Sequence, residues 1–431
     1  MNKIKILILT GLVIFFTSTF SQVGSPYSQY GLGDNTYKGF EQSKAMGGIG
    51  IGLRTNKNLN SLNPASYTGL DSLSVLYLVG FNTGFNRIQS SIDKVDRNDT
   101  RLGYFVLGFK AAKKWASSIG VVPVSRVDYT YKYSDSTSEN GKVDYYLYGS
   151  GGLNKIYWSN AFDITKDLSF GFTASYVFGP LNRVSSAVFV DDWINADNTK
   201  VDKQFNVYDF TFDFGLQYKI HLKENSNIVL GVVYENKIKL NAKKSIKAGT
   251  VKNGPNLDDN FYENIYEGEL IRTIIDTQNI KSTVSLPSAF GFGFTYTNKK
   301  IIVGADFYEQ MWSEVQNNLY DTKLRNMMTV RAGVEYTPNY NSVGKYYKKI
   351  HYRFGGHFTQ SQMEIRGVGI NDFGVSFGAG FPLRNTKTSF NLSCEFGQRG
   401  TLEQNLLKEN YVIISLNISL SDIWFVKRKF N

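Results

Sequence analysis

The sequence predicts an all-β protein: a 14-stranded antiparallel transmembrane β-barrel with an N-terminal hatch, or plug, inside it. The main observation is an alternation of apolar and small polar residues that recurs along most of the chain. Such alternation is typical of a sheet with lipid on one side and water on the other. Near the C-terminus one face carries Val412, Ile414, Leu416, Ile418 and Leu420, and the other carries Ser415, Asn417 and Ser419.

Residues 1–21 are predicted to be a signal peptide. The basic region Met1 to Lys5 precedes the apolar run Ile6 to Phe20, and Ser21-Gln22 is a suitable cleavage point. The alternative, a retained membrane helix, is weaker because this apolar run is shorter than the roughly 20 apolar residues that a bilayer span needs. Export followed by barrel formation predicts an integral protein of the cell outer membrane.

Residues 22–70 are predicted to form the hatch segment. The segment is rich in glycine and has no long alternation, which indicates irregular backbone that must lie in a wet or buried place. The lumen of the barrel is the natural position. The run Gly47 to Gly52 is not interpreted as a phosphate-binding loop, because no strand and helix of a βαβ unit flank it.

Residues 71–431 are predicted to form the barrel. The number of candidate strands is even, as a closed single-chain antiparallel barrel requires. The last strand is expected to close the barrel against the first strand, near Leu73 to Phe81. The predicted strands cover residues 72–86, 102–112, 115–133, 143–164, 168–185, 203–220, 227–248, 283–297, 300–314, 326–338, 348–362, 371–383, 387–398 and 409–424.

The alternation is clearest in four places, of which two strands serve as examples. In the strand 168–185, the lipid face is predicted to carry Leu168, Phe170, Phe172, Tyr176 and Phe178, and the lumen face Ser169, Gly171, Thr173 and Ser175. In the strand 203–220, the lipid face is predicted to carry Tyr208, Phe210, Phe212, Phe214, Leu216 and Tyr218, and the lumen face Asp209, Thr211, Asp213, Gly215 and Gln217.

The connections are of two kinds, which alternate along the chain. Short connections at periplasmic ends and longer ones at outer ends are expected for an outer-membrane barrel. The predicted periplasmic turns are 113–114, 165–167, 221–226, 298–299, 339–347 and 384–386. The predicted outer loops are 87–101, 134–142, 186–202, 249–282, 315–325, 363–370 and 399–408.

Several short motifs, in order along the chain, resemble those of one known family. They are Asn63-Pro64-Ala65, Leu286-Pro287-Ser288-Ala289-Phe290-Gly291, Ala305-Asp306-Phe307-Tyr308 followed by Trp312-Ser313, Arg331-Ala332-Gly333-Val334-Glu335-Tyr336, and Tyr352-Arg353-Phe354-Gly355-Gly356. Each motif is weak alone, but the ordered set resembles the FadL/TodX family of outer-membrane transporters for long-chain fatty acids and other hydrophobic compounds. The resemblance covers nearly the whole mature chain.

The resemblance implies a fourteen-stranded barrel in which outer loops capture an apolar ligand. The ligand then leaves sideways into the bilayer beside a kinked strand, and movement of the hatch acts as the gate. Asn63, Pro64 and Ala65 would lie in the hatch, either as gating residues or as a tight turn that locks the plug. The sequence favours neither of these two roles over the other.

The predicted lumen face is mainly glycine, serine, threonine and charged residues. Asp306, Arg331, Glu335 and Arg353 lie on three successive predicted strands, so they are expected to form a polar lumenal network. We favour a role in tethering the hatch over contact with a substrate. An apolar pocket would then have to come from the hatch and the outer loops. Further inward charged residues are predicted at Asp209, Asp213, His357 and Glu395.

Enzyme, cofactor, metal and nucleic-acid functions find little support. His221, His351 and His357 are not spaced as metal ligands, and no serine lies in a G-x-S-x-G turn. The single cysteine, Cys394, provides no internal disulfide, thiolate cluster or lipoprotein anchor. The net charge of +11 is attributed to lysine-rich turns and loops that meet anionic lipid headgroups, in preference to nucleic-acid binding. An acidic loop contains Asp258, Asp259 and Glu263 but has no calcium-loop pattern.

Two functional hypotheses follow. The first is passive uptake of a hydrophobic small molecule, which requires an apolar cavity continuous with a gap in the barrel wall. The second is a non-transporting barrel of the same fold that serves as a partner subunit of an outer-membrane secretion or assembly machine. This second role requires a sealed wall and an exposed apolar patch on the loops or rim. Phe430, next to the C-terminal residue, is a candidate recognition element for barrel-assembly machinery.

Overall fold

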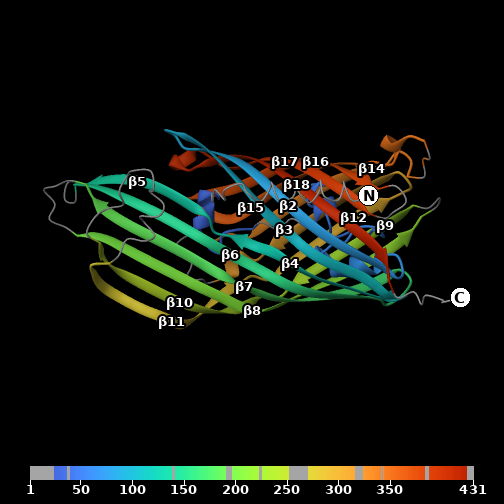
Figure 1. Cartoon of the computed structure of the whole chain (residues 1–431), viewed down its shortest axis with the longest axis horizontal. Coiled ribbons are helices and arrows are strands. Elements are labelled where there is room, and N and C mark those ends of the chain that lie inside the picture. Colours follow the sequence, from blue (N-terminus) through green and yellow to red (C-terminus); the bar gives the residue numbers. More distant parts are fainter. Residues whose placement is uncertain are drawn as a thin grey trace, which may run out of the picture.

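The protein folds as a closed antiparallel β-barrel (Figure 1). The computed structural model describes residues 24–35, 39–137, 141–190, 197–222, 226–251, 270–315, 324–340, 342, 344–383 and 388–424. The predicted signal peptide, the acidic loop at Asp258, Asp259 and Glu263, and Phe430 lie outside these ranges. The barrel closes where the last strand pairs with the first, from Ile423 opposite Ser74 to Lys408 opposite Gln89. The predicted closure is therefore confirmed.

The elements have the following bounds. The strands are β1 (Asp34–Asn35), β2 (Ser74–Gln89), β3 (Lys94–Ala112), β4 (Trp115–Arg126), β5 (Tyr129–Thr137), β6 (Gly141–Asp163), β7 (Leu168–Phe189), β8 (Asn198–His221), β9 (Asn227–Glu235), β10 (Ile238–Val251), β11 (Arg272–Leu286), β12 (Ala289–Thr297), β13 (Ile301–Gln310), β14 (Met327–Tyr336), β15 (His351–Ile365), β16 (Val368–Pro382), β17 (Ser389–Gly400) and β18 (Lys408–Ile423). The helices are η1 (Pro26–Gln29), α2 (Glu41–Lys44), η2 (Pro64–Gly69), η3 (Trp312–Glu314), η4 (Tyr346–Lys348) and η5 (Glu403–Asn405). In the described part of the chain, no helix is long and apolar enough to cross a membrane.

The wall contains fourteen strands. Three of them are interrupted, because β4 continues as β5, β9 as β10 and β11 as β12. β1 belongs to the N-terminal segment and pairs with the end of β4, with Asp34 opposite Arg126. When each interrupted strand is counted once, the predicted number of strands and their antiparallel order are confirmed.

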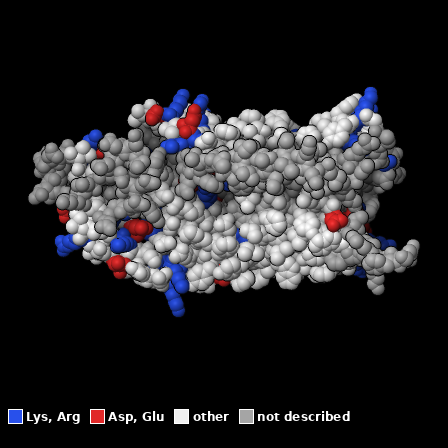
Figure 2. Space-filling model, in the orientation of Figure 1, with Lys and Arg blue, Asp and Glu red and all other residues white. Residues whose placement is uncertain are grey.

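The outer surface of the wall has an apolar belt. On β8, the even-numbered residues from Tyr208 to Tyr218 are 37–55% exposed, whereas Gly215 and Gln217 on the other face are buried. This stretch matches the roughly 9–11 residues that a tilted strand needs to cross a bilayer. On the face drawn in Figure 2, the described residues in the middle are largely uncharged, and charged side chains lie mostly toward the two ends. The belt therefore identifies the lipid-facing surface.

Three predicted outer loops are largely strand instead. Within 87–101, β2 continues to Gln89 and β3 begins at Lys94; within 134–142 and 363–370 the strands likewise run almost to the turn. These extensions were not predictable from the alternation, because they lie beyond the apolar belt and have no lipid-facing side. The inter-strand hydrogen bonds there continue the ladders of the wall.

Six wall strands extend well beyond the belt on one side of the barrel. We call the outer parts of β5, β6, β7, β8, β10 and β11 the overhang; β5, β10 and β11 mark it at the left of Figure 1. The ladder between β8 and β10 runs from Val207 opposite Ala242 to Asn198 opposite Val251. At about 3.3 Å per residue, this ladder is roughly 30 Å long. The overhang is an open sheet, because it does not continue around the barrel.

Candidate functional site

The candidate site is the interface between the lumen and the N-terminal segment, which we define as residues 24–70. This segment lies inside the barrel and is bonded to strands around its circumference. Hydrogen bonds join Ser25 to Glu409, Glu41 to Ser393, Gln42 to Glu335, Lys44 to Asn82, Gly47 to Ser376, Gly50 and Ile51 to Asp306, Arg54 to Ser169, and Asn63 to the backbone of β8. Burial raises the pKa of the Glu41 carboxyl.

Asp306 holds a turn of the N-terminal segment against the wall. One oxygen of its buried carboxylate accepts hydrogen bonds from the backbone N–H groups of Gly50 at 2.6 Å and Ile51 at 2.8 Å. Gly293 lies opposite Asp306 on the neighbouring strand, and a Cβ there would be 2.1 Å from the carboxylate. The absence of a side chain at Gly293 therefore leaves space for the Asp306 carboxylate, which accepts the hydrogen bonds of the two backbone N–H groups in this turn.

Arg331 lies opposite Asp306 across the β13–β14 ladder. Its guanidinium donates to the backbone carbonyl of Gly48 at 3.3 Å. No ion pair within 4.0 Å joins Arg331 to Asp306 among the described contacts, although the two charges face each other across one rung. These two predicted residues therefore act in parallel, each on the backbone of the same turn.

Glu335 and Arg353 form a second cluster of the predicted lumenal residues. Arg353 donates to Glu335 at 2.7 Å and to the amide oxygen of Asn391 at 2.8 Å, and both charged side chains are buried. His351 lies 3.2 Å from the other oxygen of Glu335. From the N-terminal segment, Gln42 donates to Glu335 at 3.0 Å. The predicted four residues thus lie in two clusters, each with a contact to this segment.

Asn63, Pro64 and Ala65 begin the short helix η2. Asn63 caps it, because its side-chain oxygen accepts from the Ala65 N–H at 3.0 Å, and proline is favoured in a first helical turn. The Asn63 amide donates to the carbonyls of Ile51 at 2.9 Å and Leu216 at 3.1 Å. The motif therefore joins two parts of the N-terminal segment to β8, which fits a locking turn and leaves its gating role a prediction.

Gly171 and Gly215 of the wall make room for this motif, because a Cβ at Gly171 would be 2.5 Å from the Ala65 backbone nitrogen. We expect Gly215→Ala to lower the free energy of unfolding by about 1–3 kcal/mol, because the new Cβ would be 2.1 Å from the Asn63 side-chain oxygen. Thermal unfolding and hydrogen exchange of residues 60–70 measure the effect. Gly344→Ala is the matched control, since nothing lies within 4 Å of its Cβ position. Equal stability of the two variants would contradict the close packing of Gly215 against Asn63.

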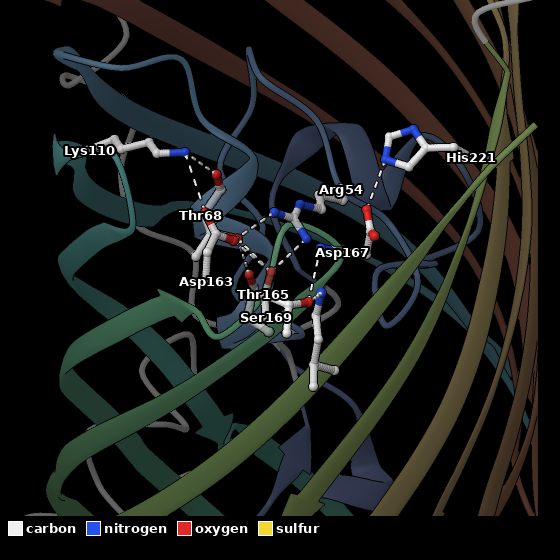
Figure 3. Close-up of polar contacts among 10 residues, drawn as sticks. Arg54, Thr68, Lys110, Asp163, Thr165, Asp167, Ser169 and His221 are labelled. Carbon is white, nitrogen blue, oxygen red and sulfur yellow. Dashed lines mark hydrogen bonds and ion pairs between the residues drawn. The ribbon is translucent and has the colours of Figure 1, made fainter.

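A polar cluster that was not predicted from the sequence holds the C-terminal part of the N-terminal segment, around Arg54 and Thr68, against the wall (Figure 3). Arg54 donates to Ser169 at 2.7 Å and to Asp163 at 3.1 Å, and Ser169 also bonds to Thr68 of η2. Lys110 donates to the Thr68 carbonyl and lies 4.0 Å from Asp163. The participants are far apart in sequence and have no shared motif, so only the closed wall brings them together.

A second missed cluster lies at a break in the wall. The β3–β4 ladder ends at Phe105 opposite Val121, so farther outward β3 pairs only with β2. β1 pairs with β4 beside this break, and Arg126 bonds to Asp99 at 2.7 Å and to Asp128 at 2.5 Å. A polar cavity of about 110 Å³ adjoins these residues. The N-terminal segment and charged side chains thus cover this break.

A cavity of about 230 Å³ lies between the N-terminal segment and strands β4 to β14. The prediction that an apolar pocket would come from the hatch and the outer loops, and not from the barrel wall, was wrong, because wall residues line this cavity. Inward side chains of the wall form a large apolar cluster beside the cavity, including Leu153, Val177, Leu181, Phe205, Val207, Leu240 and Val284. Lys155, Asp213 and Glu235 add a polar end. The cavity therefore has both an apolar and an ionisable lining.

The ladder between β8 and its next neighbour is interrupted beside this cavity. Pairing with β9 ends at Asp213 opposite Glu235 and resumes with β10 at Val207 opposite Ala242. The Asp209 carboxylate partly replaces the missing ladder, because it accepts from the backbone N–H of Asn241 at 2.9 Å. Phe212, on the lipid face within this break, also lines the cavity. The cavity therefore reaches a gap in the strand pairing.

The described residues contain no group of three or more His, Cys, Asp or Glu side chains arranged to hold a metal ion. The contacts at this interface instead attach the N-terminal segment to the wall. Backbone donors, carboxylates and buried cations hold this irregular segment inside the closed barrel. This combination of fourteen antiparallel strands, an apolar belt and an occupied lumen defines an outer-membrane β-barrel of the FadL type.

Solved structures with this fold include a hydrocarbon channel and two toluene transporters. The CymD monoaromatic hydrocarbon channel aligns with a TM-score of 0.58 and 13% identity, over 90% of this chain and 98% of that one. The Ralstonia pickettii toluene transporter TbuX aligns at 0.57 and 14%, over 89% and 99%. The Pseudomonas putida toluene transporter TodX aligns at 0.55 and 16%, over 95% and 100%. At these identities the likeness establishes the fold.

The family to which the chain belongs is shown by its sequence and not by these structures. A profile of the BamG family matches residues 2–431, and the chain belongs to the BamG family. No curated protein matches the chain by sequence.

Proposed function

We propose that this protein is a non-transporting barrel that serves as a partner subunit of an outer-membrane assembly or secretion complex. The observation that carries the proposal is the attachment of the N-terminal segment to strands all around the lumen. Membership of the BamG family supports it, because the profile that matches the whole chain is not that of the FadL/TodX transporters.

The attachment makes gating by movement of the N-terminal segment costly. A displaced segment would leave the Asp306 carboxylate, the Glu335–Arg353 pair and several backbone donors without their present partners. Each unmet buried donor or acceptor costs about 1–3 kcal/mol, and a buried charge costs more. A fixed filling for the lumen, which stiffens the barrel as a scaffold, needs no such movement.

The outer rim supports the same role. The overhang carries exposed isoleucines that do not belong to the lipid belt, among them Ile274 at 65% and Ile280 at 51% exposure. Exposed apolar side chains on an open sheet are typical of protein interaction sites. A transporter would require only a rim that admits small molecules, whereas this rim offers an extended surface.

A second candidate function, passive passage of a small hydrophobic molecule, is favoured by one observation. The 230 Å³ cavity adjoins the interrupted β8 ladder, and this is the arrangement that lateral exit into the bilayer requires. In this alternative, Asn63, Pro64 and Ala65 would take part in gating. The charged cavity lining from Lys155, Asp213 and Glu235 weighs against a purely hydrocarbon ligand.

Mild-detergent extraction of the full-length protein from its own membrane, followed by mass spectrometry of proteins and lipids, tests the two functions. We expect one or more outer-membrane proteins in stoichiometric amount and no bound fatty acid or hydrocarbon. A monomer that carries such a ligand would contradict the partner role and support transport. Sequencing the mature N-terminus in the same preparation tests cleavage between Ser21 and Gln22.

A further inference from the structure

β11 has an open edge along its outer half. From Arg272 opposite Thr250 to Leu286 opposite Ile238, one edge of β11 pairs with β10. No strand in the described ranges pairs with the other edge, and β12, which continues β11, pairs with β13 only from Ala289 onward. Figure 1 shows β10 and β11 together at the side of the overhang. The backbone groups on the open edge therefore have no ladder partner among the described residues.

This open edge is exposed on both faces of the strand. Ile274 is 65% exposed and Ile275, on the opposite face, is 45% exposed. In the lipid belt, by contrast, only one face of a strand is exposed. An exposed apolar strand edge is a template on which another extended chain can add as a strand. The outer part of β11 has both the backbone and the side chains for such pairing.

The charges around the edge select the kind of chain that can pair there. Arg272 and Lys281 on β11 and Lys247 on β10 are exposed, and Asp276 is the exposed acidic residue of β11. Asn279 has a φ of 54° and lies at a register shift between β10 and β11, which marks a bulge. Lysines and bulges on an edge oppose pairing with a second copy of the same strand. They leave the edge open to a strand of opposite charge.

The other edge of the overhang is less open. β5 pairs with β6 on one side, and its Tyr131 hydroxyl bonds to Gln29 of η1 in the N-terminal segment. Tyr129 of β5 is buried. The two edges of the same sheet therefore differ, and β11 is the better candidate for an external partner.

We propose that the outer edge of β11, residues 272–283, binds an extended acidic segment of a partner protein as an additional antiparallel or parallel strand. The proposal rests on the partner-subunit function above. It adds the place of contact, the mode of binding and the charge of the partner. Main-chain hydrogen bonds supply the affinity, and the basic side chains supply the preference for acidic sequences.

The test uses the full-length barrel in lipid nanodiscs and two synthetic ten-residue peptides, one alternating valine with glutamate and one alternating valine with lysine. We expect the glutamate peptide to slow amide hydrogen exchange in residues 272–283 and to leave β5 unchanged. The double variant R272E/K281E should bind it about tenfold more weakly and should prefer the lysine peptide. K345E/K348E carries the same charge change at the opposite end and should bind as the parent does.

Equal binding of both peptides, or protection elsewhere than on β11, would overturn the proposal. Co-purification of proteins with the R272E/K281E variant tests the β11 site separately from the proposed partner-subunit function. If that variant keeps its stoichiometric partners, the β11 proposal fails while the partner role stands. If the parent has no partner but its β11 edge binds the acidic peptide, the partner role fails while the edge site stands.

Discussion

Replacing Asp306 by alanine should release the turn at residues 47–52 from the barrel wall and lower the free energy of unfolding by about 2–5 kcal/mol. The reason is that the N–H groups of Gly50 and Ile51 would remain buried without an acceptor. Arg331 would also lose the opposite charge across its ladder rung. Thermal unfolding measures the loss, and hydrogen exchange of residues 47–53 shows whether it is local.

Two further variants make this result interpretable. Asp306→Asn keeps one acceptor oxygen in the same place, so it should restore part of the protection. Asp276→Ala removes an exposed carboxylate from the overhang and should change stability by less than about 0.5 kcal/mol. Unchanged exchange at residues 47–53 in Asp306→Ala would show that this carboxylate does not hold the segment.

Replacing Arg353 by methionine should have a second large effect, a loss of about 3–5 kcal/mol in the free energy of unfolding. Glu335 would keep its buried charge, with His351 and Gln42 as its remaining partners. Chemical denaturation of the purified barrel measures the difference. The expected reason is the unpaired charge, not the volume of the side chain, because methionine fills much of the space of arginine.

The double variant Glu335→Gln with Arg353→Met tests this reason. It removes both charges, so it should recover a large part of the stability that Arg353→Met loses. If the double variant is less stable than Arg353→Met by the full cost of a second substitution, the two side chains contribute independently. The pair would then not be the coupled tether that the geometry indicates.

The two clusters also bear on the choice between functions. A segment that is released by Asp306→Ala without unfolding of the barrel would be a separable plug, as lateral transport with a moving hatch requires. A barrel that loses global stability with the segment supports a structural filling. These outcomes concern the same residues that the sequence suggested, but the sequence did not indicate which backbone groups they would hold.

The strand count and the face of each residue in the belt were predictable because they depend on local alternation. β8 is an example: its aromatic residues and its small polar residues are separated by one position along the whole stretch from Tyr208 to Tyr218. The outer ends of β2, β3 and β5 were not predictable from this signal, since beyond the lipid neither face needs to be apolar. Their pairing appears only in the folded sheet.

The residues of the candidate site also include some that were predictable from the sequence and others that were not. Asp306, Arg331, Glu335 and Arg353 were recognisable because charged residues at alternate positions of successive strands must face the lumen and not the lipid. Arg54, Asp163 and Lys110 were not, since each follows the usual pattern of a polar residue near a strand end or in a loop. The apolar inner surface around Leu153 and Val177 was missed because the inward residues were predicted to be mainly small, polar or charged, and no face was assigned to these two positions.

Sequence alone was sufficient for the barrel class, the number of strands and the closure of the last strand on the first, because a two-residue periodicity directly reports lipid on one side. Tertiary structure decided where the N-terminal segment is bonded, which ladders are interrupted and which edge of the overhang is open. These features depend on contacts between residues that are tens to hundreds of positions apart, as in the pairing of Gly50 with Asp306. No local pattern encodes such contacts.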